Sequence, residues 1–227
     1  MNADLDSATS NGEESANGQE IETELLPEVP LMKRKKLSKS NKAAIEWVIL
    51  IVSALTIALL IKTFLFQAFV IPSESMETTL HGCAGCDNDR ILVNKLSYRF
   101  HDVNRGDIVV FEAPKNRQHD GIKDYVKRVI GLPGDYIELG NNEVLIDGEP
   151  LIEPYVNPEC AHSVADGLIA HTVPPGHVFV MGDNRCKSAD SRSFGNVEQG
   201  NYGDIPEDTI IGRAFVRIWP FGRFKFL

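Results

Sequence analysis

The sequence predicts a mainly β domain carried on a single N-terminal membrane helix. Two observations lead to this prediction. A long uncharged run directly follows a basic block, and no long segment with a helical period comes after residue 67. Instead, seven short apolar runs rich in β-branched residues recur there, punctuated by Gly, Pro, Asn and Asp. These runs cover residues 90–96, 107–113, 125–132, 135–139, 142–148, 177–183 and 209–219.

The first 42 residues divide sharply by charge. Residues 1–30 contain eight acidic residues, no basic residue and no hydrophobic period. Such a segment buries too little apolar surface to offset its ordering entropy, so it is predicted to be disordered and solvated; an acidic interaction segment is the alternative. Residues 31–42 contain six basic residues and no acidic one. A nucleic-acid patch, a localisation signal and the positive flank of a membrane helix all fit this block.

The next segment favours the membrane reading. Trp47 to Ile61 contains no charge, but fifteen helical residues reach only ~22 Å against a hydrocarbon core of ~30 Å. Extension to residues 43–66 gives 24 residues and ~36 Å, which spans a bilayer with some tilt. Glu46 and Lys62 then lie near the ends, where side chains reach the interface. A buried core helix is the alternative, and the basic block argues against it.

The charge bias also predicts an orientation. All the basic residues of 31–42 precede the helix, which places residues 1–42 in the cytoplasm and residues 67–227 outside. A cleaved signal peptide is disfavoured, because Ala68 has the bulky Phe66 two positions before it and no A-x-A site is evident. We therefore expect an uncleaved signal anchor in the lipid bilayer.

Composition and motifs exclude several function classes. With 32 acidic against 23 basic residues, the chain has a net charge of -9 and is a poor binder of nucleic acid. It lacks G-x-S-x-G, H-E-x-x-H, S-x-x-K and the phosphate-binding loop, and no metal or cofactor is expected. Asp147-Gly148 lies between two strand-like runs and predicts a hairpin, within an insert at about residues 136–177.

Three polar strings after the helix offer hydrolase chemistry. They are IPSESMETTL (71–80), KRVIGLPGD (127–135) and GDNRCKSADSR (182–192). Together they supply the serines and the lysine that a Ser-Lys hydrolase needs. A lysine acts as a base only when neutral, and complete burial can lower its pKa by ~3–5 units. Each string alone also fits an ordinary turn or a solvent-facing strand lysine.

In their order, these strings resemble the boxes of bacterial type I signal peptidase. The chain has PSESM at 72–76, RGDIVVF at 105–111, KRVIGLPGD and GDNRCKSADSR, all after a correctly oriented anchor, and the resemblance covers residues 43 to 220. It implies an antiparallel, barrel-like extracytoplasmic β domain in the bacterial cell membrane. The implied activity is cleavage of signal peptides from exported preproteins after small residues, close to the export machinery.

The resemblance also implies roles for particular residues. Ser75 would be the nucleophile and Lys127 the general base. Ser188 would orient the lysine amine, and Ser73 would join the backbone N–H of Ser75 in the oxyanion hole. Supporting residues would be Met76 near the substrate groove and the charged cluster of Asp183, Asp190 and Arg192. Two positions depart from the family pattern: Thr78 replaces a proline, and Cys186-Lys187 replaces Asp-Asn.

All four cysteines follow the helix, in the oxidising compartment. We expect the disulfides Cys83–Cys86 and Cys160–Cys186, although His81 beside the C-x-x-C pair leaves a metal site as a weaker alternative.

Two other functions remain open at this stage. One is a catalytically inactive membrane-anchored relative that serves as a binding or assembly module. The other is a Ser-Lys autoprotease of the repressor type, which the membrane anchor disfavours. The C-terminal residues 219–227 are aromatic and basic, and predict either a segment in the membrane interface or an ordinary terminal strand.

Overall fold

The computed structural model describes residues 39–117, 121–140, 143–160, 169–195 and 202–227. Most of the predicted cytoplasmic tail lies outside the described residues.

The apolar segment forms the helix that the sequence predicts. Helix α1 (Lys39–Leu60) continues as the π-helical turn Ile61–Leu65, and Asn41–Leu65 is long and apolar enough to cross a membrane. Its 25 residues reach ~37 Å. Phe66, the last residue of the predicted span, instead begins strand β1, because its backbone pairs with Asn94 in the adjacent strand.

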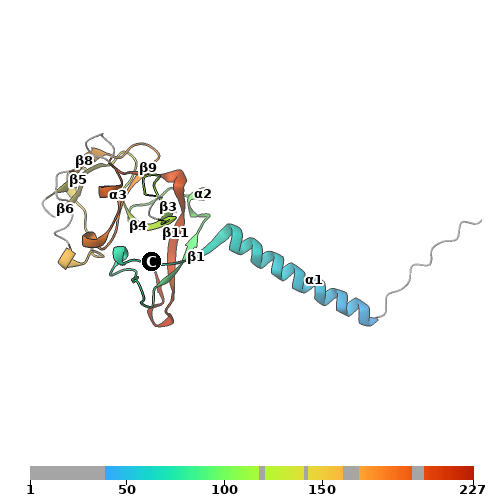
Figure 1. The fold of residues 1–227 in the computed structure, drawn as a ribbon. Helices are drawn as coiled ribbons and strands as arrows, with labels where there is room; N and C mark the ends of the chain where they lie inside the picture. Colours follow the sequence, from blue (N-terminus) through green and yellow to red (C-terminus); the bar gives the residue numbers. More distant parts are fainter. Residues whose placement is uncertain (1–38, 118–120, 141–142, 161–168, 196–201) are drawn as a thin grey trace, which may run out of the picture. The chain divides into compact units, whose positions relative to one another are not determined.

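Among the described residues, eight strands form a large antiparallel sheet. In order they are β1 (Phe66–Val70), β2 (Arg90–Asn94), β11 (Ile210–Trp219), β3 (Ile108–Glu112), β4 (Asp124–Gly131), β9 (His177–Met181) and β10 (Ile205–Pro206), with β12 (Lys225–Phe226) pairing with β11 (Figure 1). Each predicted run in this sheet contains one of its strands, so the mainly β prediction is confirmed. Strands β1 and β10 were not predicted, since each is short or lies at an edge.

The large sheet is buried on both faces, which explains its continuous apolar runs. In β3, Val109 and Phe111 pack on one face, whereas Ile108 and Val110 pack on the other. A sheet that is covered on both sides loses the alternation of polar and apolar residues. Strand β4 keeps that alternation from Asp124 to Val129, and this register decides which of its residues point inward.

A smaller antiparallel sheet is built from the insert. Among the described residues its order is β7 (Glu149–Pro150), β6 (Glu143–Ile146), β5 (Tyr136–Gly140) and β8 (Ile169–Thr172). The predicted hairpin is confirmed: Asp147 and Gly148 both adopt positive φ, at 52° and 82°, and join β6 to β7. Apolar side chains of this sheet pack against β9 of the large sheet. The insert therefore buttresses the strand that leads into the last polar string.

Short helical turns connect the strands. They are α2 (Ser97–Phe100), α3 (Ser191–Phe194) and the 3₁₀ turns Glu74–Met76, Pro158–Cys160, Arg185–Lys187, Glu207–Thr209 and Phe221–Arg223. At the C-terminus, β12 is a terminal strand, as one of the two readings expected. Phe221, Phe224 and Phe226 nevertheless expose most of their side chains.

Candidate active site

Ser75 and Lys127 are brought together from two elements that are far apart in the sequence. Ser75 lies in the 3₁₀ turn Glu74–Met76, and Lys127 lies on β4. The Lys127 Nζ donates a hydrogen bond to Ser75 Oγ at 2.8 Å and a second to the carbonyl of Val126 at 2.9 Å. This is the distance at which an amine can take a proton from a hydroxyl.

Strand register explains why Lys127 points inward. Tyr125, Lys127 and Val129 alternate with partly exposed neighbours along β4, so Lys127 occupies a buried position and is only 2% exposed. Burial lowers its pKa to about 8, while the charges of Asp190 and Asp183 act in the opposite direction. A lysine with this pKa is partly neutral at mildly alkaline pH, which a general base requires.

The turn that carries Ser75 is fastened to the loop after β9. Asn184 donates from its backbone N–H to the Ser75 carbonyl at 3.1 Å and from Nδ2 to the Glu74 carbonyl at 3.0 Å. Sequence reasoning did not single out Asn184. Its place within GDNRCKSADSR was the available signal, but that string did not show which residue faces the nucleophile.

Gly182 allows this loop to approach so closely. A Cβ at this position would overlap both the Ser75 carbonyl oxygen and Ser188 Oγ. The backbone oxygen is fixed by its hydrogen bond to Asn184, so it cannot retreat from an added methyl group. Gly182 is therefore a requirement of the site's geometry.

Asp183 and Asp190 each form a two-pronged ion pair beneath the site. Arg128 donates to both oxygens of Asp183 at 2.8 and 2.6 Å, and Thr79 donates to the same carboxylate at 2.5 Å. Arg192 donates to both oxygens of Asp190 at 2.8 Å each. Both aspartates are fully buried. The described contacts thus pair Asp183 with Arg128 and Asp190 with Arg192.

The Asp190 carboxylate remains ionised despite its burial. Burial disfavours its charge, but the hydrogen bonds and charge of Arg192 and the backbone N–H of Gly182 outweigh that effect. The pKa of Asp190 therefore falls below its usual value. Asp190 also caps α3 through the backbone N–H of Arg192, which fixes the far end of the loop.

Ser73 and Ser188 differ in their relation to the pair. Ser73 Oγ lies 3.3 Å from Ser75 Oγ. Within the described residues, the expected hydrogen bond between Lys127 and Ser188 is not formed, and Ser188 Oγ is buried without a hydrogen-bond partner. The hydroxyl still lies near enough to Asp190 to help lower that pKa. The amine has instead turned toward Ser75 and the carbonyl of its own strand.

A groove of about 590 Å³ runs over Ser75 and Lys127. Its other lining residues are Phe69, Val70, Ile71, Pro72, Ser73, Met76, Arg117, Gly121, Ile122, Lys123, Asp124, Tyr125, Val126, Lys187 and Ala189. Met76 contributes to this wall although it is fully buried. Among the described strands, β9 pairs with β4 only from Arg128 onward, and β1 is an edge strand. Unpaired strand edges therefore border the groove.

Two disulfides are formed, one in the loop after the nucleophile's turn and one in the loop after β9. The structure pairs Cys83 with Cys86 and Cys160 with Cys186, with Cα–Cα distances of 5.5 and 5.2 Å. The second bridge ties the loop after β9 to the insert, where Arg185 also forms an ion pair with Glu153. A crosslink over 26 residues stabilises this connection by restricting the unfolded chain.

Comparison with known proteins identifies this arrangement. The family model described as "Signal peptidase, peptidase S26" matches residues 44–219. The chain belongs to this family. A "Probable signal peptidase I" from Mycobacterium leprae (strain TN) is 35% identical, in an alignment that covers 82% of this chain and 80% of that protein. A "Signal peptidase IB" from Staphylococcus aureus (strain MRSA252) is 35% identical over 200 residues, covering 82% of this chain and 95% of the relative.

A solved structure also matches. It is the crystal structure of a signal peptidase I from Enterococcus faecalis V583, with 28% identity and a TM-score of 0.38, covering 50% of this chain and 97% of that one. Family membership rests on the sequence, and with the apolar helix Asn41–Leu65 it describes a membrane-anchored S26 peptidase.

Proposed function

We propose that this peptidase removes signal peptides from exported preproteins by a Ser75–Lys127 acyl-enzyme mechanism. The single observation that carries the proposal is the 2.8 Å hydrogen bond from the buried Lys127 amine to Ser75 Oγ. The burial supports it as well, since a pKa of about 8 leaves part of the amine neutral near neutral pH.

The proton transfers of this acyl-enzyme reaction balance with Ser75, Lys127 and one water molecule. Neutral Lys127 takes the Ser75 hydroxyl proton as Oγ attacks the carbonyl at the cleavage site, and the resulting ammonium gives a proton to the departing amine. The acyl-enzyme is hydrolysed when water attacks the ester, with Lys127 again as the base. Ser75 Oγ then recovers its proton, and the signal peptide leaves with a free carboxylate.

The negative charge that develops on the substrate carbonyl oxygen must be stabilised by hydrogen-bond donors. We assign this role to the Ser75 backbone N–H and to the Ser73 hydroxyl, whose Oγ is 3.3 Å from Ser75 Oγ. We retain Ser188 as the residue that orients the lysine. Its buried, unpartnered hydroxyl, judged over the described residues, is available to the ammonium once that group has left Ser75.

The groove suits an extended substrate. A peptide strand in it can form main-chain hydrogen bonds with the open edges of β1 and of Asp124–Lys127, while small side chains enter the apolar wall. Specificity for small residues, as in the A-x-A pattern, follows from a wall that contains Ile71, Met76 and Tyr125.

Membrane topology completes the proposal. The basic block before the helix favours a cytoplasmic N-terminus and a catalytic domain outside, where cleavage sites emerge near the export machinery. The domain limits expected from the sequence, residues 1–42, 43–66 and 67–227, stay part of this proposal, with Phe66 moved to the β domain because it begins β1.

Cleavage of a labelled preprotein by the full chain in detergent tests the mechanism. Ser75→Ala and Lys127→Ala should each lower the rate by at least about 10³-fold, because each removes a group needed in the transition state. Lys115→Ala is the matched control, since Lys115 is exposed and lies outside the groove. Near-full activity of Lys127→Ala would make the lysine structural. Failure of the wild type on several preproteins would favour an inactive binding module.

A further inference from the structure

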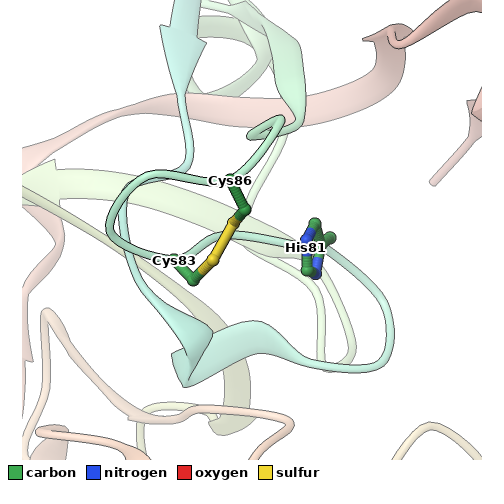
Figure 2. A group of neighbouring side chains, drawn as sticks. All are labelled: His81, Cys83 and Cys86. Atoms are coloured by element: carbon green, nitrogen blue, oxygen red, sulfur yellow. A yellow bond between two sulfur atoms is a disulfide. The ribbon is translucent and has the colours of Figure 1, made fainter.

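A cluster of metal-ligating side chains lies beside the site and has no part in the proposed mechanism. It consists of His81, Cys83 and Cys86 (Figure 2). One ligand atom from each residue lies within 4.8 Å of the others, and all three residues are partly exposed. Figure 2 shows the histidine ring next to the disulfide on the same loop. The C-x-x-C spacing is common in zinc sites, and the histidine supplies a third donor of the right type.

Hydrogen bonds and ion pairs hold this loop in addition to the disulfide. Asp89 closes its base: the His81 N–H donates to the Asp89 carboxylate at 2.8 Å, and the Asp89 N–H donates to the His81 carbonyl at 2.9 Å. Asp89 is fully buried and forms ion pairs with Arg217 and Arg223 at 3.2 and 3.1 Å. The side chain of Asn88 further accepts the Cys83 N–H at 2.9 Å. Opening of the disulfide would therefore leave the two cysteines on a defined backbone.

His81 already has the contact that typifies a metal-binding histidine. Its Nδ1 pairs with the Glu77 carboxylate, four residues earlier. Ligating histidines usually bond a carboxylate or carbonyl through the second ring nitrogen, which fixes the ring and raises its basicity. Here the carboxylate occupies Nδ1 and leaves Nε2 to serve as a ligand.

We propose that the reduced form of this loop binds one thiophilic divalent cation, such as Zn²⁺, through His81, Cys83 and Cys86. Around a tetrahedral zinc ion, with Zn–S of ~2.3 Å and Zn–N of ~2.0 Å, ligand atoms lie about 3.5–3.8 Å apart. The Cα–Cα distance of 5.5 Å between the cysteines allows this spacing with side-chain rotation alone. A water molecule would fill the fourth position, since the partly exposed loop is open to solvent.

The chemistry balances with a dithiol reductant. Thiol–disulfide exchange transfers two electrons and two protons to Cys83 and Cys86, and the reductant leaves as a disulfide. The cation then displaces the two thiol protons. The disulfide and the metal are thus alternative crosslinks of one loop. The loop also touches the nucleophile's segment, because Gly82 lies against the backbone of Ile71 and Ser73.

Metal binding can be measured independently of cleavage. The full chain in detergent, carrying Cys160→Ser and Cys186→Ser so that only one cysteine pair remains, is reduced with a phosphine, which takes an oxygen atom from water as it is oxidised. Alkylation and mass determination verify the free thiols. Zinc is then titrated into the reduced and the oxidised protein. We expect one ion per reduced chain and none at this loop in the oxidised chain.

Variants distinguish the site from adventitious thiol binding. His81→Gln should weaken zinc binding strongly, and Glu77→Gln should weaken it about 10–100-fold, because it removes the partner of the ligand. His101→Gln, at an exposed histidine outside the cluster, is the matched control and should bind like its parent.

Two results would overturn the proposal. One is reduced protein with verified thiols that binds no more zinc than the Cys83→Ser/Cys86→Ser variant. The other is His81→Gln with undiminished affinity. A circular-dichroism melt of each variant shows whether a loss of zinc binding is only a loss of folding. The oxidised and reduced forms of the Cys160→Ser/Cys186→Ser chain can also be compared directly, without any further substitution.

Discussion

Two lysines line the same groove, and their surroundings give them opposite properties. Lys127, on the groove's floor, is 2% exposed, whereas the Lys187 side chain, on the rim, is 65% exposed. Burial lowers the pKa of Lys127 to about 8, while the hydrogen bond that Lys187 donates to the Glu74 carboxylate raises the pKa of Lys187. Both lysines have carboxylates nearby, so nearby charge does not explain the difference between their pKa values. The buried position of Lys127 in the register of β4 does.

Removal of a charge from the buried loop near Lys127 should lower the free energy of unfolding far more than removal of a charge at the exposed rim of the groove. Asp190→Asn deletes the charge of a fully buried carboxylate and removes its ion pair with Arg192. Loss of one member of a buried pair typically costs about 3–5 kcal/mol. Denaturant unfolding of the domain should report a loss of that size at neutral pH.

The same variant has a pH signature. Because the folded-state pKa of Asp190 is lowered, its contribution to stability is complete above the usual carboxyl pKa and is lost as the pH falls through the folded-state value. Asp190→Asn should therefore destabilise less in acid than at neutral pH. Equal destabilisation at every pH would mean that the carboxylate acts through packing and not through its charge.

A second way to break the floor is steric. Gly182→Ala places a methyl group against the Ser75 carbonyl and Ser188, so the turn that carries the nucleophile must shift. A shift of the nucleophile by about 1 Å typically lowers the rate about 10²-fold. Preprotein cleavage at saturating substrate is the measurement. Gly222→Ala is the control, because nothing lies within 4 Å of its added carbon. Equal rates for the two variants would show that the loop accommodates the methyl group without moving Ser75, and would contradict this prediction.

The smallest effect is expected on the rim. Glu74 and Lys187 form an ion pair at 2.6 Å, but both side chains are well exposed to solvent. Exposed pairs of this kind often contribute nothing measurable to stability. Lys187→Ala and Glu74→Gln should leave the midpoint of thermal unfolding unchanged. A clear drop for either variant, at low and at high salt alike, would contradict the distinction between floor and rim.

The central strands of the large sheet were largely predictable, whereas the contacts within the site were not. Runs of β-branched residues predicted β3, β4 and β9 because burial on both faces leaves a continuous apolar signal. Short strands such as β8 and β10 have no such signal, since pairing partners elsewhere in the chain stabilise them.

The chemistry was predictable only in part. Ser75 and Lys127 were found by resemblance, because they are 52 positions apart in the sequence and nothing in it shows that they are close in space. The partners that fix them, Asn184 and Gly182, act through backbone contacts that no pattern of residue types reveals. The expected hydrogen bond to Ser188 failed for a related reason: a lysine side chain has several acceptors in reach, and the sequence does not rank them.

The central claim, that burial makes Lys127 a neutral base for Ser75, is tested most directly by the pH dependence of kcat/KM. The substrate should be a signal peptide without titratable groups near its cleavage site, and the range about pH 6 to pH 10. The account predicts a rate that rises with pH and levels off above an apparent pKa of about 8. A rate that is flat across this range, or that still rises toward the ordinary lysine value of 10.5, would contradict it.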